Sequence, residues 1–211
     1  HHYISPELDA QESLLVLQTR LSEEGVEFAK KILQAIHEVK DEFAQSVDYK
    51  INIEQIPGER AACILMEKDK LFHPNEVYEL PLYGNQWIPL GVKTSIAEKV
   101  KLSAILDEAC SGGSIAHINL DAPFRDFDTA WKMLNYVADA GVTYFAFNLR
   151  ISACKNNHGF FGDVCPVCGS PKVTTYQRIV GFLTPEKTYS TERKAEFRMR
   201  DWFDLNIMEE M

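Results

Sequence analysis

The sequence lacks the features of a membrane or exported protein. It contains no run of about 18 apolar residues, the length that suggests a membrane span. It also has no basic segment followed by an apolar one near its beginning. We therefore predict neither a membrane span nor a signal peptide, and we expect the protein to be cytoplasmic.

The sequence also lacks an excess of positive charge. Its 31 acidic residues outnumber the 22 basic ones, which gives a formal net charge of -9. That balance repels phosphate backbones and anionic membranes, so neither nucleic acid nor a membrane surface is an expected partner. A small charged substrate remains compatible, because local fields can oppose the net charge. With 45% apolar residues among 211, the chain can bury a sizeable core.

Cysteine is scarce, with five residues, but its distribution is uneven. Three cysteines fall within residues 154–168, where one histidine also lies. In a reducing compartment such residues are more often metal ligands or free thiols than disulfides. Cys63 is expected to be a small buried apolar residue. A pairing of Cys110 with His117 as nucleophile and base lacks a third, orienting residue at a recognisable spacing.

Apolar residues at intervals of three and four predict helices over residues 6–20, 23–46, 95–109 and 128–141. The last of these is expected to begin at a cap, Asp126 or Asp128, and to close at Gly141. The pair Gly112 and Gly113 is expected to end the helix before it.

Segments in which apolar and polar residues alternate, or which are rich in β-branched residues, predict strands over residues 49–56, 115–120 and 142–151. Between the first strand and a helix that starts at Glu59 lies a loop with Pro57 and Gly58. An ordinary turn explains this loop, but its N–H groups could also face an anionic ligand. Strand, helix and strand in short succession indicate an α/β fold with a parallel or mixed sheet.

The cluster in residues 154–168 has the spacing Cys-x3-His-x6-Cys-x2-Cys, formed by Cys154, His158, Cys165 and Cys168. Soft thiolates with one imidazole favour zinc, and four protein ligands leave no open position, so we predict a structural zinc site. A redox dithiol at Cys165 and Cys168, or plain buried thiols, are the alternatives. The composition changes near Ile151, which predicts one domain over residues 1–150 and a small one over residues 151–211.

Several segments together resemble one enzyme family. They are Arg178-Ile-Val-Gly181-Phe182, a tail with Lys194, Glu196, Arg198 and Arg200, and upstream segments over residues 53–59, 83–90 and 112–117. In combination they are similar to the C-terminal end of anaerobic (class III) ribonucleotide reductases. Phe182 stands where the family usually has Tyr, and His158 stands where a fourth cysteine is usual.

The resemblance implies a fold and a radical chemistry. The fold would be part of a ten-stranded α/β barrel of the glycyl radical enzyme type, followed by a zinc-binding and glycyl radical domain. Gly181 would hold the stable radical, installed by an activating enzyme that uses S-adenosylmethionine and an iron–sulfur cluster. A glycine Cα radical is stabilised by its flanking amide groups in a planar arrangement, which a side chain would hinder.

The resemblance also implies substrates and partners. The radical would generate a thiyl radical on a cysteine outside this chain, which takes the 3′-hydrogen of a ribonucleotide and leads to a deoxyribonucleotide. Pro57, Gly58 and Glu59 would lie near the substrate phosphates. The chain would be a fragment or split piece that needs the remainder of the reductase, in a homodimer of the full enzyme. Alternatives are another glycyl radical enzyme acting on a small organic substrate, and a non-catalytic zinc module.

Overall fold

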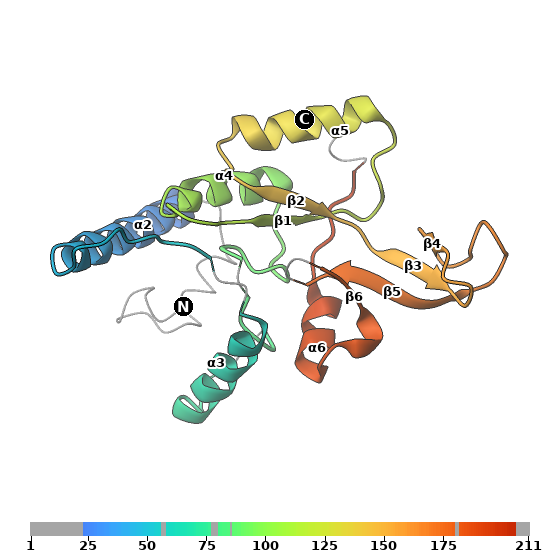
Figure 1. Ribbon diagram of the computed structural model, residues 1–211, viewed down its shortest axis with the longest axis horizontal. Helices are drawn as coiled ribbons and strands as arrows, with labels where there is room; N and C mark the ends of the chain where they lie inside the picture. Colours follow the sequence, from blue (N-terminus) through green and yellow to red (C-terminus); the bar gives the residue numbers. More distant parts are fainter. Residues whose placement is uncertain (1–22, 56–57, 77–79, 85, 180–181, 206–211) are drawn as a thin grey trace.

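The computed structural model describes residues 23–55, 58–76, 80–84, 86–179 and 182–205. The helix predicted over residues 6–20 lies outside the described residues. The helices are α2 (Glu23–Ala44), α3 (Glu59–Phe72), α4 (Ile96–Asp107), α5 (Phe127–Asp139) and α6 (Thr191–Met199), with a 3-10 turn η1 (Glu186–Thr188) (Figure 1). None of the helices in this part of the chain is long and apolar enough to cross a membrane.

A parallel pair of strands, β1 (Ala116–Asn119) and β2 (Phe145–Asn148), forms one sheet. Parallel strands need a crossover connection, and α5 supplies it, lying along one side of the pair (Figure 1). Ile118 and Leu120 pack there with Met133 and Val137 of α5. The predicted strand, helix and strand are thus confirmed as a mixed α/β arrangement.

The strand predicted over residues 142–151 is wrong in its extent. β2 ends at Asn148, and Ile151 begins a new strand in a different sheet. This stretch is rich in β-branched and aromatic residues throughout, so the sequence pattern does not show where one hydrogen-bonding partner is exchanged for another.

An antiparallel sheet follows, in the order β4-β3-β5-β6. Its strands are β3 (Ile151–Cys154), β4 (Gly159–Phe160), β5 (Lys172–Arg178) and β6 (Leu183–Pro185). The sheet projects away from the helices, with β4 near its far end (Figure 1). The change from parallel to antiparallel pairing falls at the predicted change of composition. Beyond α6 the chain returns, and Phe203 forms a parallel bridge with Leu120.

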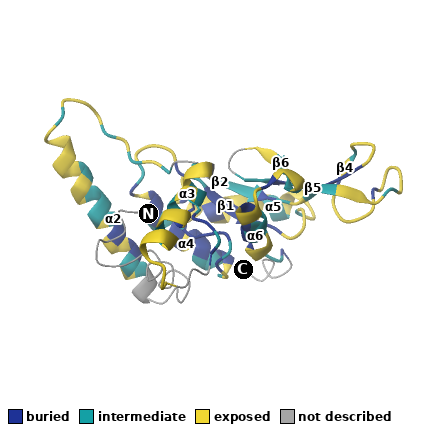
Figure 2. Ribbon diagram, turned by 90° about the horizontal axis from the view of Figure 1, so that it is seen from below, coloured by how far each residue is buried: buried dark blue, intermediate teal, exposed yellow. Residues whose placement is uncertain are grey.

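The helix predicted over residues 95–109 is observed as α4. Ser95 caps it and accepts a hydrogen bond from the Glu98 amide, while the Glu98 side chain accepts one from the Ser95 amide. The predicted end at Gly112 and Gly113 is wrong, because α4 already ends at Asp107. α4 packs against α2 in a second apolar cluster, and Figure 2 shows the buried residues concentrated around α4 and β1.

The strand predicted over residues 49–56 is also wrong, since residues 50–55 form no strand. Ile53 and Gln55 instead hydrogen-bond to the turn that follows α4: Gly112 N donates to Ile53 O at 2.9 Å, and Gln55 N donates to Gly113 O at 2.8 Å. A Cβ added to Gly112 would come within 2.9 Å of Glu54 Oε2, so the two segments approach closely. The two glycines therefore hold an extended segment rather than end a helix.

Candidate functional site

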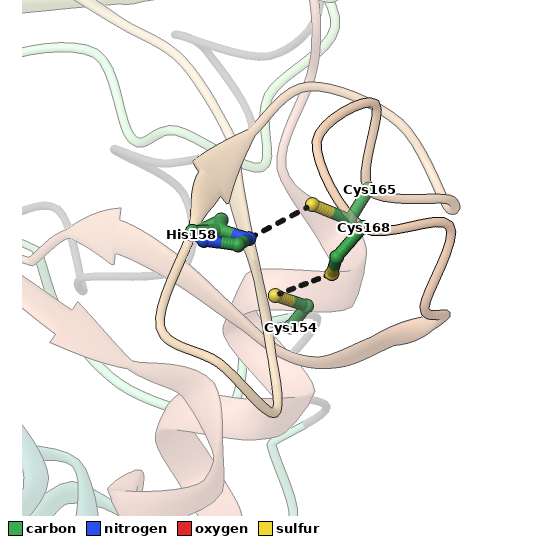
Figure 3. A group of neighbouring side chains, drawn as sticks. All are labelled: Cys154, His158, Cys165 and Cys168. Atoms are coloured by element: carbon green, nitrogen blue, oxygen red, sulfur yellow. Dashed lines mark hydrogen bonds between the residues drawn. The ribbon is translucent and has the colours of Figure 1, made fainter.

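Four side chains that could hold a metal ion converge at the far end of the antiparallel sheet. Cys154 is the last residue of β3, His158 lies in the turn to β4, and Cys165 and Cys168 lie between β4 and β5. One ligand atom from each lies within 4.8 Å of the others (Figure 3). All four residues were predicted from their spacing, and the structure brings all four together.

The distances in the cluster fit a tetrahedral zinc ion. With zinc–sulfur bonds of about 2.3 Å and zinc–nitrogen bonds of about 2.05 Å, a tetrahedron places two sulfurs about 3.8 Å apart and a sulfur and a nitrogen about 3.6 Å apart. Cys154 Sγ lies 3.7 Å from Cys168 Sγ, and Cys165 Sγ lies 3.5 Å from His158 Nδ1. A redox dithiol would need only Cys165 and Cys168, so the convergence of four groups favours a metal.

Two left-handed turns present these ligands. Asn157 has φ 61° and its amide donates to Cys154 O at 3.0 Å, which reverses the chain so that His158 faces Cys154. Gly169 has φ 66° and donates to Cys165 O at 2.9 Å. Glycine and asparagine tolerate this region best, so the residue types after the ligands agree with the turns.

The three cysteines of the cluster differ in their exposure to solvent. Cys154 and Cys165 are buried, whereas Cys168 is exposed. Hydrogen bonding with Ser170 lowers the pKa of Cys168 to about 5, because it stabilises the thiolate, the form that binds metals. Burial raises the pKa of Cys165. Among the described residues the buried cluster here contains only Cys154, Phe160 and Cys165, which is too little to hold these loops by apolar packing.

The glycine motif follows β5 in the sequence, whereas the four candidate metal ligands precede it. Gly181, predicted to carry the radical, lies outside the described residues. Arg178 and Leu183 are paired partners in β5 and β6, so residues 179–182 connect these two antiparallel strands. β5 has seven residues, which at about 3.3 Å each give a length of roughly 23 Å. The four candidate ligands therefore lie near one end of a ribbon whose other end is followed in sequence by residues 179–182.

A buried ion network lies beside that second end. Arg193, Glu196 and Arg200 of the α6 region are all buried, and both arginines contact the Glu196 carboxylate. The resemblance in the tail had singled out Lys194 and Arg198 as well, but Arg198 is exposed and Lys194 only half-buried. Arg193 was missed. Arg193 lies three residues before Glu196, on the same face of the helix as Arg200. This spacing of opposite charges is the sequence signal that could have identified it.

The parallel pair turns a polar face away from its apolar core. His117 and Asn119 alternate with Ile118 and Leu120, and Asn148 Nδ2 lies 2.9 Å from His117 Nδ1 and 3.1 Å from Asn119 Oδ1. Burial lowers the pKa of His117 to about 4, assisted by the positive charges of Arg178, Arg200 and Lys99. His117 is therefore neutral near pH 7.

Cys110 and His117 do not form the nucleophile and base considered above. His117 Nδ1 is bonded to Asn148, and burial raises the pKa of Cys110, which opposes formation of a nucleophilic thiolate. Cys110 and Cys63 are both of intermediate exposure, so the expectation that Cys63 is buried is wrong.

Comparison with known proteins identifies the family. A family model described as anaerobic ribonucleoside-triphosphate reductase matches residues 10–203, which include the metal ligands and the glycine motif. The chain belongs to this family. No curated protein sequence matched the chain.

Solved structures of this family are similar to the chain. One described as anaerobic ribonucleotide reductase is 37% identical, with a TM-score of 0.81 over 92% of this chain and 32% of its own. The Thermotoga maritima enzyme with glycerol in its active site is 40% identical, with a TM-score of 0.72 over 83% of this chain and 29% of its own. The same enzyme in complex with dATP and CTP is 36% identical, with a TM-score of 0.72 over 90% and 32%. The chain thus spans about a third of these structures.

The predicted substrate loop is only partly described. Pro57 lies outside the described residues, Gly58 is the N-cap of α3, and Glu59 is its first residue. The helix start predicted at Glu59 is confirmed. The role of these three residues in binding substrate stays a prediction.

Proposed function

We propose that this chain is the C-terminal part of an enzyme that reduces ribonucleotides to deoxyribonucleotides by radical chemistry in the absence of oxygen. The observation that carries the proposal is the family match over residues 10–203, because it includes both the group of metal ligands and the motif around Gly181. The fraction of the matched structures that the chain covers supports a role as one piece of the catalytic unit.

Cys154, His158, Cys165 and Cys168 would hold one structural zinc ion. The distances among the ligand atoms support this assignment. Four protein ligands leave no place for a reactive water, so the ion would stabilise the loops around β4 instead of reacting with substrate.

Gly181 would be the radical residue. When installed by an activating enzyme with S-adenosylmethionine and an iron–sulfur cluster, the radical supplies the oxidising equivalent for a cysteine outside this chain. The residues of this chain position it, since β5 and β6 hold the two ends of residues 179–182.

Residues 1–150 would form part of a ten-stranded α/β barrel, and residues 151–211 a zinc-binding and glycyl radical domain. The parallel pair with α5 on its apolar side, and His117, Asn119 and Asn148 on its polar side, supports a barrel wall whose polar face is turned inward. Pro57, Gly58 and Glu59 would lie near the substrate phosphates. The remainder of the reductase, the activating enzyme and a second copy of the full chain would be the partners.

Electron paramagnetic resonance tests the radical assignment. The complete reductase carrying this chain is treated anaerobically with its activating enzyme and S-adenosylmethionine, and the spectrum is recorded before and after. We expect a doublet from the single α-hydrogen of the radical glycine, and its loss in Gly181→Ala. Gly113→Ala is the matched control, because a Cβ there meets nothing within 4 Å. A doublet that survives Gly181→Ala contradicts the assignment.

Metal analysis tests the zinc assignment separately. We expect one zinc per chain and a weaker affinity in His158→Ala, because one of four ligands is removed. The control is His73→Ala, which changes an exposed histidine at the end of α3. Unchanged zinc affinity in His158→Ala would exclude His158 as a ligand.

A further inference from the structure

Tyr189 joins the two strands that lead into residues 179–182. It follows η1, is 6% exposed, and places its Oη 3.4 Å from Gln177 O and 3.3 Å from Thr184 O. Gln177 and Thr184 are paired partners of β5 and β6, next to the last pair before the connection. The single hydroxyl proton is therefore shared between one carbonyl of each strand at the base of the hairpin.

The Tyr189 hydroxyl remains a donor under ordinary conditions. Burial raises the pKa of Tyr189 to about 12, so the phenol keeps its proton near neutral pH. The ring packs edge-on against Phe197 of α6, with 5.8 Å between ring centroids. The hydroxyl is thus held in place by the packing of the ring, and the hairpin base is tied to α6.

Arg200, the C-cap residue of α6, also reaches the end of β5. Its side chain is fully buried, with Nε 2.8 Å from Glu196 Oε1 and Nη2 2.9 Å from Glu196 Oε2. The remaining nitrogen, Nη1, donates to the carbonyl of Arg178 at 3.3 Å. Because a guanidinium is planar and rigid, the pair with Glu196 fixes the direction of this third hydrogen bond.

The start of the connection lies against the same charged side chains. Ile179, the first residue after β5, lines a cavity of about 20 Å³ together with Glu196, Arg200 and Gln86. Arg193 also contacts Glu196, with Nη1 3.0 Å from Oε2. Arg200 therefore hydrogen-bonds to the last strand residue of β5 and lines the same cavity as the first residue after it.

We propose that Tyr189 and Arg200 are positioning residues for the radical: they form a hairpin clamp that fixes the facing ends of β5 and β6, the strands between which Gly181 lies in the sequence. The proposal rests on the proposed radical role of Gly181. The clamp and the metal site act on opposite ends of β5. The metal holds the end of β5 near Cys154, whereas the clamp fixes the end from which residues 179–182 continue.

The test compares Tyr189→Phe, Arg200→Met and Arg200→Lys in the complete reductase. Tyr189→Phe removes only the bridging hydroxyl and keeps the packing on Phe197. We expect about fivefold less radical per chain, the equivalent of one hydrogen bond of about 1 kcal/mol. Arg200→Met should lose more than about tenfold, since it removes three charge-assisted hydrogen bonds, and Arg200→Lys should recover part of that loss.

Two control variants carry the same kinds of substitution at positions outside the clamp. Tyr144→Phe removes a hydroxyl from a side chain that is 59% exposed, and Arg198→Lys changes an exposed arginine of α6. Both should keep the radical yield of the parent. Zinc content, measured on every variant, should stay at the parent value, because the clamp lies at the other end of β5.

Amide hydrogen exchange of the peptide over residues 176–185 gives a readout that does not need the radical. It should be faster in Tyr189→Phe and Arg200→Met than in the parent and the controls. Parent-like exchange and radical yield in both variants would overturn the clamp. If Arg200→Met loses zinc as well, its loss of radical is not specific to the clamp. The radical yield and exchange of Tyr189→Phe then decide whether the clamp exists. If the parent shows no doublet that depends on Gly181, the radical assignment fails, and exchange alone still decides whether the clamp exists.

Discussion

The parallel pair β1–β2 and the antiparallel sheet β4-β3-β5-β6 lie next to each other in sequence but differ in what holds them. The parallel pair packs into a cluster of buried apolar residues from α4, α5 and the C-terminal segment. At the far end of the antiparallel sheet, the buried cluster among the described residues consists of Phe160 and two of the candidate metal ligands, Cys154 and Cys165. Figure 2 shows the same contrast, with exposed loops around β4 and buried residues around β1.

The difference teaches that one chain can use two sources of stability. Apolar burial stabilises an element in proportion to the area removed from water, and the loops around β4 have little area to bury. A structural metal replaces that core with a few strong bonds, so it can stabilise a projection where no helix covers the sheet. Each region should therefore respond to a different perturbation.

The largest effect is expected from removing a metal ligand. Cys165→Ser should abolish stoichiometric zinc and unfold the loops around β4, because structural zinc binding contributes on the order of 10 kcal/mol. Metal analysis and amide exchange over residues 151–176 measure both effects, and exchange over residues 116–148 should be unchanged. Cys110→Ser, outside the cluster, is the control. Equal protection of residues 151–176 with and without zinc would show that packing suffices there.

The converse perturbation is a cavity in the apolar core. Leu120→Ala should lower the free energy of unfolding by about 4 kcal/mol, because a fully buried leucine loses its contacts and leaves a void. Urea unfolding measures the change, and zinc affinity should be unaffected. Leu71→Ala, at a side chain that is 74% exposed, should change little. A loss of zinc in Leu120→Ala would mean that the two regions fold as one unit.

Acidification should act on the polar face of the parallel pair. The folded chain holds the pKa of His117 at about 4, whereas the unfolded chain takes up that proton near 6.5. The unfolded state therefore binds more protons between these values, so stability falls as the pH is lowered from 6.5 to 4, by up to about 3 kcal/mol. Unfolding measured across this range should show a shallower slope in His117→Gln, and His73→Gln should retain the parent slope.

The smallest effect is expected at a helix cap in the first region. Ser95→Ala removes the side-chain acceptor for the Glu98 amide and should cost about 1 kcal/mol. Glu98→Gln keeps a group that can accept from the Ser95 amide, so its loss should be smaller. Thermal unfolding measures both variants. Protection of residues 151–176 should not change in either, and a parallel loss there would contradict the independence of the two regions.

The sequence predicted those features whose cause lies within a few residues. α4, α5 and the start of α3 follow from apolar periodicity and from caps such as Ser95 and Asp126, which are local interactions. The four metal ligands follow from short spacings and from Gly169, which needs a left-handed turn. The strand predicted over residues 49–56 failed because alternation does not specify a partner, and the partner of Ile53 is a turn distant in sequence.

The sequence by itself therefore determined α2, α4 and α5, the four candidate metal ligands and the resemblance to anaerobic ribonucleotide reductases, since each depends on residue types at short, fixed spacings. Only the tertiary structure decided that the candidate metal ligands gather near the start of β5 and that Arg178, at its end, pairs with Leu183 of β6. Only it brought Tyr189 and Arg200 onto the base of that hairpin. Such contacts arise from the pairing of strands and the packing of α6, and backbone carbonyls such as Arg178 O carry no sequence signal that would reveal their partners.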